Sequence, residues 1–424
     1  MGEATAVAPM LAAAIEPLIG GQLPIRLIAW DGSIAGPAAA PVVWLRSAAV
    51  LRRMLWHPSE LAAAQAYVSG ELDVDGDLAA ALTQVWTQIT ERRLRPLGGS
   101  PRALERLCAV AARLGAIGGP LPPSASRARM RSRLNSLSHD GTANHRHYDL
   151  SNAFYRLILD PSMAYSCAYW KPGRPGTTLE QAQRDNLDRI CRKLGLDRRP
   201  DMRVLDVGCS WGSLSLHAAE HYGARVVGTT LSAEQKAHID AALIERRLGD
   251  RVEIRLQDYR AITDGPFDAA ASIEMGERVG RRNYPTYARI LHGCVRPGAR
   301  VLIQQMARPG SHPGGSVSGS FIAPDRHMRP LGQTIALLEQ AGLATIAVDA
   351  MREHYVRTVD TWIDNLETRW DAAVALIGEQ AARAWRLYLA AGRLAFVQGY
   401  MVVDQILLTR PTLAGNGASH SAMA

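Results

Sequence analysis

Between residues 178 and 305 the chain alternates helical segments with short apolar strands, and this alternation constrains the fold more than any other feature. Helices are expected at 179–194, 213–222 and 233–248, and strands at 203–207, 225–230, 252–256, 267–273 and 301–305. Such alternation predicts an α/β domain with a mostly parallel, doubly wound sheet and helices on both faces. Ligands of these sheets bind beyond the carboxyl ends of the strands, so the residues that follow each strand are the first candidates for a site.

The first of these strands runs into a glycine-rich turn, written VLDVGCSWG at 204–212. Asp206 precedes Gly208 and Gly212 with the spacing DxGxxxG. A dinucleotide fold would favour GxGxxG with an acid about 20 residues later. The arrangement is typical of methyltransferases and predicts a backbone that a nucleotide cofactor approaches closely. A tight strand–helix turn without a ligand is the alternative.

Polar residues also follow the next two strands. Thr230 ends the second strand and Gln235 follows it, and their hydroxyl and amide can bond ribose hydroxyls without a charge, with the apolar Leu231 between them. Asp258 and Tyr259 come after the third, where the acid can accept from an adenine amino group and the ring can pack on the base. Each of them alone could be a turn or a cap, but their order along the chain indicates one cofactor site.

The remaining segments predict a second, smaller domain. Residues 1–120 carry expected strands at 23–30 and 41–45 and helices at 48–56, 58–67, 77–91 and 101–114, with no catalytic motif. They indicate a smaller α+β N-terminal accessory domain with a lipid or dimer role. Residues 121–145 form a basic linker, residues 146–410 the catalytic domain with a C-terminal helical region that would wall an acyl pocket, and residues 411–424 a disordered tail.

Cysteine use, hydropathy and charge narrow the protein's class. The five cysteines are scattered without a CxxC, which argues against a disulfide framework and suits a reducing cytosol. His327 and His354 have no partners at metal-ligand spacing, so no metal is predicted. The chain has no apolar run of about 18 residues. The net charge of +8 suits an anionic surface or solubility alone, and the basic residues lack the interleaved aromatic positions that nucleic acid binding would use.

Further motifs resemble those of the cyclopropane fatty acid synthase and mycolic acid cyclopropane synthase family. They are HYDLSN at 147–152, LDPSM at 159–163, YSCAYW at 165–170, SIEMGERVG at 272–280, and His354-Tyr355 followed by Thr358 and Trp362. The resemblance covers roughly residues 145–410. It implies a Rossmann-like class I methyltransferase that uses S-adenosyl-L-methionine to modify the double bond of a lipid acyl chain.

The resemblance also assigns residues to the site. Tyr165, Ser166, Asp206, Gly208, Gly212, Thr230, Leu231, Gln235, Asp258 and Tyr259 would form the cofactor site. Cys167, Glu277 and Tyr355 would lie near the reacting methyl group. In the family a glutamate, a histidine and the tyrosine hold a bicarbonate ion that acts as the base, so bicarbonate is a candidate second cofactor.

The sequence departs from the family at four of these positions. Ser210 stands where the family has glycine, Arg278 where it has histidine, and Gly392 where many members have cysteine. Gln304 takes the place of the bicarbonate-binding histidine. These changes resemble an actinobacterial, tuberculostearic-type branch that methylates oleoyl chains to 10-methylene fatty acids. A cyclopropane product and a non-catalytic lipid-binding homologue remain alternatives, as does, with less support, a small-molecule methyltransferase.

The chemistry needs a base and a means of stabilising a carbocation. Glu277 is the first candidate for the base, directly or as holder of bicarbonate, with Gln304 still able to bond an anion, and Glu274 is the weaker candidate. Tyr165, Tyr169, Trp170 and Tyr355 could stabilise a cation, and core packing is the alternative for each.

These predictions imply a set of partners and a place in the cell. The substrate would be an oleoyl-like chain in phospholipid, reached by peripheral binding to the cytoplasmic face of the membrane. A homodimer is compatible with the sequence, and a methylene product would call for a downstream reductase.

Overall fold

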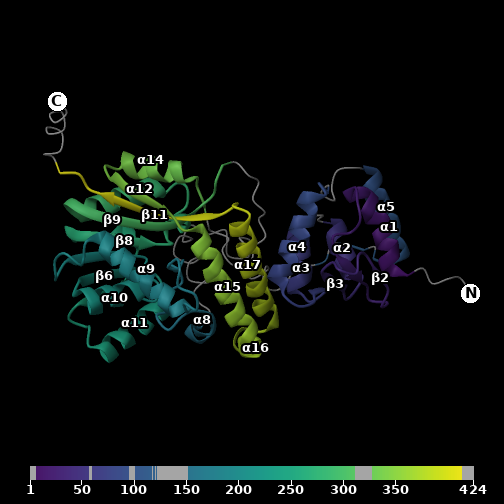
Figure 1. Cartoon of the computed structure of the whole chain (residues 1–424), viewed down its shortest axis with the longest axis horizontal. Coiled ribbons are helices and arrows are strands. Elements are labelled where there is room, and N and C mark those ends of the chain that lie inside the picture. Colours follow the sequence, from purple (N-terminus) through teal and green to yellow (C-terminus); the bar gives the residue numbers. More distant parts are fainter. Residues whose placement is uncertain are drawn as a thin grey trace, which may run out of the picture. The chain divides into compact units, whose positions relative to one another are not determined.

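The computed structural model describes residues 6–56, 60–94, 101–116, 118–119, 121, 151–310 and 327–412 (Figure 1). Residues 122–145 of the predicted basic linker, residues 147–150 of the HYDLSN motif and residues 413–424 of the predicted tail lie outside these residues. The chain divides into two compact units. The first joins the described residues up to 121 with 370–394, and the second comprises 151–310, 327–369 and 395–412.

The second unit is built on a seven-stranded sheet with the order β10-β11-β9-β8-β5-β6-β7. Its strands are β5 (Arg203–Val207), β6 (Arg225–Thr230), β7 (Val252–Leu256), β8 (Phe267–Ile273), β9 (Val295–Ala307), β10 (Ala344–Ala350) and β11 (Val402–Thr409). Only β11 runs antiparallel to its neighbours in this sheet. The predicted mostly parallel, doubly wound sheet is therefore confirmed.

Helices cover both faces of this sheet (Figure 1). One face carries α9 (Leu179–Leu194), α10 (Ser213–Tyr222) and α11 (Ala233–Arg246), and the other carries α12 (Tyr284–Cys294) and α14 (Leu331–Gln340). Each face has its own core, with Ile190 and Ile239 on the first and Leu291 and Leu338 on the second. Since successive strand residues point to opposite faces, a shift of the strand register by one residue would move each side chain from one core to the other.

Local sequence signals explain where the helices begin and end. The Thr178 hydroxyl accepts a hydrogen bond from the Gln181 amide and starts α9, and Gly195 ends this helix in a left-handed conformation. The Ser232 hydroxyl accepts from the Gln235 amide and starts α11. Because these signals are local, the predicted bounds of α9, α10 and strands β5 to β8 coincide with those observed.

The remaining elements of the second unit differ more from the sequence prediction. The helices α8 (Asn152–Ile158) and α15 (Arg352–Thr368) pack together, and α15 also contacts β11. The 3-10 turns η1 (Tyr259–Ala261) and η2 (Gly276–Arg278) follow β7 and β8. Strands β10 and β11 were not predicted from the sequence, which indicated a helical region here.

The first unit contains a four-stranded sheet with the order β2-β1-β3-β4. Its elements are α1 (Val7–Ile19), β1 (Arg26–Ile28), β2 (Ile34–Ala35), β3 (Val42–Leu45), α2 (Ala49–Trp56), α3 (Glu60–Val68), β4 (Leu72–Val74), α4 (Leu78–Glu91), α5 (Pro101–Arg113), α16 (Trp370–Ile377) and most of α17 (Glu379–Val397). This mixture of helices and strands is the α+β arrangement that the sequence indicates.

The sequence predicted that residues 370–394 belong to the 146–410 domain, whereas the structure places them in the first unit. One buried arginine explains this difference. Arg383 on α17 donates to the backbone oxygens of Tyr67 and Leu72 and pairs with Asp73 at 3.0 Å. A desolvated guanidinium requires such partners. Helical periodicity identifies an apolar face but does not specify which core that face joins.

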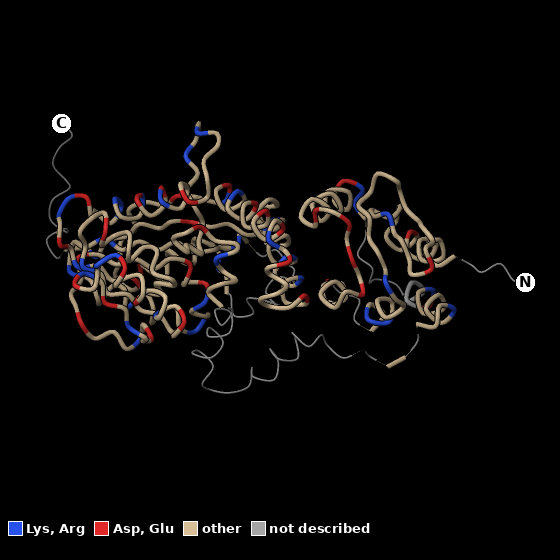
Figure 2. Tube along the Cα trace, turned by 90° about the horizontal axis from the view of Figure 1, so that it is seen from below, with Lys and Arg blue, Asp and Glu red and all other residues tan. Residues whose placement is uncertain are grey.

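Charge is mixed along the surface of each unit (Figure 2). Surface pairs include Arg246 with Glu220 and Arg251 with Asp201, and such exposed pairs add little to stability. None of the helices among the described residues combines the length and the apolar content that crossing a bilayer requires.

Candidate active site

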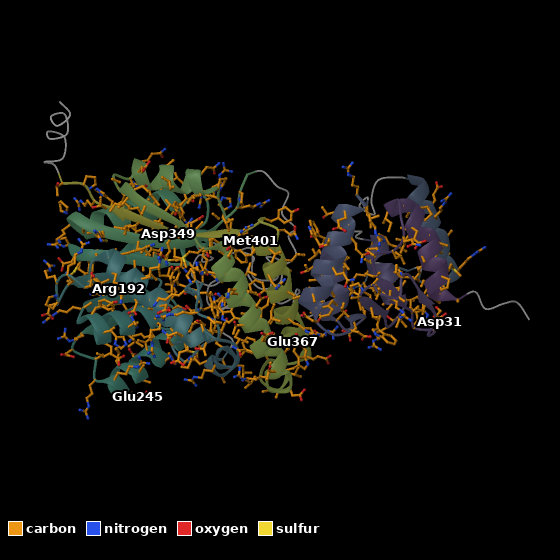
Figure 3. All side chains as sticks on the ribbon, viewed as in Figure 1. Asp31, Arg192, Glu245, Asp349, Glu367 and Met401 are labelled. Atoms are coloured by element: carbon orange, nitrogen blue, oxygen red, sulfur yellow. The ribbon has the colours of Figure 1, made fainter. Side chains whose placement is uncertain are left out.

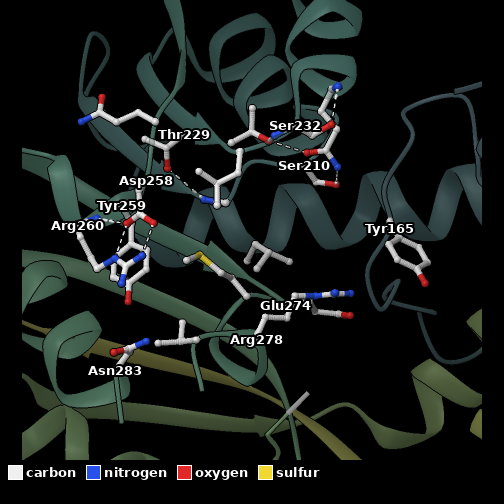
Figure 4. A pocket seen from close by; sticks show the side chains of 18 residues that line it. Tyr165, Ser210, Thr229, Ser232, Asp258, Tyr259, Arg260, Glu274, Arg278 and Asn283 are labelled. Atoms are coloured by element: carbon white, nitrogen blue, oxygen red, sulfur yellow. Dashed lines mark hydrogen bonds and ion pairs between the residues drawn. The ribbon is translucent and has the colours of Figure 1, made fainter. Parts of the chain in front are cut away.

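A pocket lies beyond the carboxyl ends of β5, β6, β7 and β8, where the sequence predicted a site (Figure 4). Asp258 and Arg260 lie at one end of the view and Tyr165 at the other, with Glu274 between them. The lining residues are Tyr165, Gly208, Ser210, Thr229, Thr230, Leu231, Ser232, Gln235, Gln257, Asp258, Tyr259, Arg260, Ile273, Glu274, Met275, Arg278, Val279 and Asn283.

The turn after β5 needs glycine at two positions. Gly208 has a φ of +77°, and a Cβ there would lie 2.8 Å from the sulfur of Met275. Gly212 has a φ of +80°, and a Cβ there would lie 2.9 Å from Ile239. Ser210, which replaces the family's glycine, also has a positive φ of +53°. The DxGxxxG spacing thus reflects backbone geometry that side chains disfavour.

The end of β6 presents hydroxyl and amide groups to the pocket. The Thr230 hydroxyl donates to Gln235 Oε1 at 2.7 Å and accepts from the Ser232 amide at 3.1 Å. Gln235 Nε2 reaches Ser210 Oγ at 3.5 Å. These neutral groups are the ones the sequence analysis assigned to ribose hydroxyls.

The end of β7 presents a carboxylate that an arginine holds in place. The Asp258 carboxylate accepts from Arg260 Nε at 2.9 Å and from Nη2 at 2.8 Å. Burial raises the pKa of Asp258, but the hydrogen bonds and charge of Arg260 outweigh it, and the net shift is downward. The neighbouring Tyr259 ring is buried and meets Tyr287 edge to face at 5.7 Å. Arg260 was missed in the sequence analysis, although it follows the predicted pair directly.

Glu274 brings together most of the residues that the sequence assigned to catalysis. It follows β8 with a φ of +52°, an unusual conformation for a residue with a side chain. Its Oε1 accepts from the Cys167 amide at 2.7 Å and from Gln304 Nε2 at 3.2 Å. Its Oε2 accepts from the Tyr355 hydroxyl at 2.7 Å. A carboxylate with three donors thus lines the pocket.

Cys167 contributes its backbone rather than its thiol to this cluster. The thiol lies near the carbonyl oxygens of Ala168, at 3.3 Å, and Met351, at 3.6 Å. Burial raises the pKa of the Cys167 thiol well above its usual value, and the charge of Glu274 raises it further. The thiol is therefore neutral and unsuited to nucleophilic chemistry near neutral pH.

Glu277, the first candidate from the sequence, lies elsewhere. Its side chain is 1% exposed, and it is not among the described residues that line the pocket. Its charge acts on the phenols of Tyr284 and Tyr287, which belong to the α12 side of the sheet. Arg278, which stands where the family has histidine, does line the pocket.

Aromatic rings gather next to the pocket. Tyr165 lies 5.3 Å from Trp362 and 5.7 Å from Tyr155, and Tyr355 lies 5.9 Å from Trp362 and 4.7 Å from Phe396. Such faces can stabilise a cation by about 0.5–2 kcal/mol each.

The other two aromatic candidates already carry a cation. Arg189 covers the Tyr169 ring at 4.7 Å, and Arg357 covers the Trp170 ring at 4.5 Å. Tyr165 and Tyr355 are therefore better placed than this pair to face a substrate cation.

Three residues of the predicted cofactor set lie behind the pocket wall. Ser166 is buried, and its carbonyl accepts from Gln183 at 2.8 Å. Burial raises the pKa of Asp206 to about 6, against the hydrogen bond that its carboxylate accepts from Ser215 at 2.7 Å. Gly212 begins α10. These residues shape the wall without lining the pocket.

Comparisons with known proteins agree with this geometry. A family model described as mycolic acid cyclopropane synthetase matches residues 135–406. A probable fatty acid methyltransferase of Mycobacterium tuberculosis is 34% identical over 92% of this chain and 92% of its own. The tuberculostearic acid methyltransferase UfaA1 of the same organism is 31% identical over 92% of this chain and 88% of its own.

A solved structure extends the similarity to three dimensions. Mycolic acid cyclopropane synthase CmaA1, complexed with SAH and CTAB, aligns with a TM-score of 0.59 and 29% identity, over 63% of this chain and 98% of its own. Together with this sheet and pocket, the family model and the relatives identify an S-adenosylmethionine-dependent methyltransferase. The chain belongs to the mycolic acid cyclopropane synthetase family.

The residues present fit S-adenosylmethionine. Thr230 and Gln235 offer uncharged partners for ribose hydroxyls, and Asp258 offers an acceptor for an amino group. Ile273, Met275 and Val279 provide apolar surface along the same wall. When bound, the cofactor supplies an electrophilic methyl group.

Proposed function

We propose that the protein transfers the methyl carbon of S-adenosylmethionine to the double bond of an unsaturated acyl chain in phospholipid, giving a 10-methylene fatty acid. Glu274 is the base of this reaction. The observation that carries the proposal is the Glu274 carboxylate, which lines the cofactor pocket and accepts from Cys167, Gln304 and Tyr355.

The proposed reaction balances with groups in the pocket. The alkene π electrons form a bond to the methyl carbon as the sulfur–carbon bond breaks, which leaves S-adenosylhomocysteine and a carbocation on the chain. The rings of Tyr165 and Tyr355 favour that cation. A hydride shift then moves the positive charge to the carbon that bears the new methyl. Glu274 takes a proton from this methyl, and the electron pair left behind forms the exocyclic double bond.

Bicarbonate does not fit this site as the base. The resemblance assigns a bicarbonate ion to the tyrosine and to the position that Gln304 occupies. Here the hydroxyl of Tyr355 and the amide of Gln304 already donate to Glu274. A side-chain carboxylate thus uses the donors that an ion would need, and no step of the proposed reaction passes through bicarbonate.

Two considerations favour a methylene product on a lipid. Relatives that match this chain over nearly its whole length carry the names fatty acid methyltransferase and tuberculostearic acid methyltransferase. The proposed base is also a side-chain carboxylate, whereas the resemblance assigns this role to a bicarbonate ion in the cyclopropane synthases. Phospholipid would be reached by peripheral binding at the membrane surface, since the acyl chain must enter a pocket in a folded domain.

Lipid analysis tests the proposal. The protein is expressed in a bacterium that lacks its own cyclopropane synthase, with methyl-deuterated methionine in the medium, and the fatty acids are examined by mass spectrometry and proton NMR. The proposal predicts deuterium-labelled chains by mass spectrometry, and vinylidene protons in the NMR spectrum of lipid from a parallel culture grown on unlabelled methionine. Ring protons would replace it with a cyclopropane synthase.

A control variant keeps a negative result informative. Glu274→Gln preserves the shape of the side chain and removes the base, so it should bind the cofactor and give no labelled lipid. If soluble wild-type protein also leaves the olefin unlabelled, the proposal fails and a non-catalytic lipid-binding protein takes its place.

A further inference from the structure

A chain of buried amides runs from Glu274 away from the pocket. Gln304 on β9 and Gln405 on β11 are register partners in the sheet, so their side chains share one face. Asn186 on α9 packs against that face, and all three amide side chains are fully buried. Lys193, in the last turn of α9, lies at the outer end.

The hydrogen bonds of this chain are continuous. Lys193 Nζ donates to Gln405 Oε1 at 2.6 Å, and Gln405 Nε2 donates to Gln304 Oε1 at 2.8 Å. Gln304 Nε2 then donates to Glu274 Oε1 at 3.2 Å. Every link has its N–H pointing from the ammonium group toward the carboxylate.

The two ends of the chain determine this direction. An ammonium group only donates, and an ionised carboxylate only accepts. Turning the Gln304 amide alone would place its oxygen against Glu274 and its NH₂ against that of Gln405. Turning both amides would place the Gln405 NH₂ against the Lys193 ammonium. Only the observed direction avoids contacts between like groups, and buried groups without partners are costly.

Asn186 strengthens the same arrangement from the side. Its Oδ1 accepts from Gln405 Nε2 at 2.8 Å, which leaves its NH₂ to donate to the Cys167 carbonyl at 2.9 Å. The N–H of Cys167, which belongs to the preceding peptide group, donates to Glu274. The Gln304 donor to the carboxylate therefore depends on how Gln405 is turned, and Asn186 holds Gln405 in that orientation.

We propose that Lys193 and Gln405 are positioning residues for the methyl transfer reaction, because they turn the Gln304 amide so that its N–H faces the carboxylate of Glu274. This inference rests on the proposed role of Glu274 as the base. Neither residue is among the described residues that line the pocket, and the hydrogen bonds link both to Glu274 through Gln304.

Other charged and titratable groups surround the two ends of the chain. At the inner end, Glu274 meets the Tyr355 hydroxyl and the Cys167 amide, with the neutral Cys167 thiol next to it, and Arg278 lines the same pocket. At the outer end, Arg189 and Lys193 both pair with Asp349 of β10, which Figure 3 labels, and Arg189 Nε also donates to Gln405 Oε1 at 3.4 Å. Burial lowers the pKa of Lys193, and the neighbouring Asp349 opposes that shift.

Two variants test the proposal by steady-state kinetics across pH. Gln405→Glu keeps an oxygen for Lys193 but presents a second oxygen to Gln304, whose NH₂ then turns away from Glu274. We expect kcat to fall about tenfold and the acidic limb of the kcat–pH profile to move up by about one unit, since the ionised base loses a donor. Lys193→Met, at a partly exposed position, should give a smaller change of about threefold in the same direction.

Gln305→Leu is the matched control, because Gln305 is a buried amide on the opposite face of the same strand. It should alter thermal stability without moving the acidic limb. The proposal is overturned if Gln405→Glu or Lys193→Met folds and keeps both the wild-type kcat and the wild-type limb. An unlabelled lipid with wild-type protein would overturn the proposed function and this inference together. If the wild type is active, Glu274→Gln is inactive, and both Gln405→Glu and Lys193→Met behave like wild type, the inference alone is overturned.

Discussion

The two sides of the β8-β9-β11 part of the sheet carry matching polar residues with different arrangements. The side covered by α9 has Glu274 and Gln304, and the side covered by α12 has Glu277 and Gln305. On the first side, donors converge on a carboxylate that lines the pocket. The same residue types therefore serve different purposes on the two faces of the sheet.

On the α12 side, Gln305 bonds two neighbouring hydroxyl groups instead of a carboxylate. The Tyr284 hydroxyl donates to Gln305 Oε1 at 2.7 Å, and Gln305 Nε2 donates to Thr334 at 3.2 Å. Gly276 must lack a side chain here, because a Cβ would lie 1.9 Å from Gln305 Oε1. Burial raises the pKa of the Tyr284 phenol, and this outweighs the lowering effect of the nearby Arg329. This arrangement fixes the turn after β8 and holds η2 against β9.

The largest expected effect comes from exchanging each carboxylate for its amide. Glu274→Gln should lower kcat by about a thousandfold, which is within the range for loss of a general base. Glu277→Gln should change kcat by less than about tenfold and act mainly on stability. Single-turnover rates with labelled cofactor measure both. A large loss in Glu277→Gln with an active Glu274→Gln would reverse the comparison and restore the base favoured by the sequence.

A smaller effect concerns Asp404, which precedes Gln405 on β11 and pairs in register with Gln305. Burial raises the pKa of Asp404 to about 6, and within the part of the chain that the structure describes no donor reaches its Oδ2. A raised carboxyl pKa means that the folded state is penalised once pH rises above the unfolded value. Asp404→Asn removes this penalty. Its unfolding free energy relative to wild type should increase by about 1–2 kcal/mol between pH 4 and pH 6.

Asp268 provides the control of opposite sign. Burial alone would raise the pKa of Asp268, but the amide of Arg203 and the side chains of Arg199 and Arg296 lower it overall. The unfolding free energy of Asp268→Asn relative to wild type should therefore decrease as pH rises through the titration of the carboxyl. Denaturant unfolding at several pH values checks both variants. If the relative unfolding free energies of both variants changed in the same direction with pH, Asp404 would not be a buried carboxyl group whose desolvation lacks compensating hydrogen bonds.

Much of the fold and the cofactor half of the site could be predicted from the sequence, because the signals there are local. A strand, a turn with glycines at Gly208 and Gly212, and a capped helix follow one another directly in the chain. The residues after β6 and β7, including Thr230 and Asp258, lie where parallel strands bring them together. Strand alternation is therefore sufficient to place them.

The reacting half could not be predicted in the same way, because segments far apart in the chain form it. Cys167, Gln304 and Tyr355 reach Glu274, and Gln405 reaches Gln304, only through the register of β9 with β11 and the packing of α15. Glu274 and Glu277 are three residues apart, and spacing alone does not reveal that a positive φ at Glu274 directs its carboxylate toward the pocket. One signal was available, namely the polar pair Asp404-Gln405 inside an otherwise apolar strand.

The measurement that tests the central claim most directly is chemical rescue of Glu274→Gly. Glycine suits the positive φ at this position, so the variant removes the carboxylate without adding backbone strain. Methyl transfer to the lipid olefin is followed in bicarbonate-free buffer and again with added bicarbonate or formate. We predict that wild type is insensitive to both ions, and that the variant is inactive without them and recovers part of its rate with them. A wild-type enzyme that requires bicarbonate, or a variant that is fully active without either ion, would contradict the account.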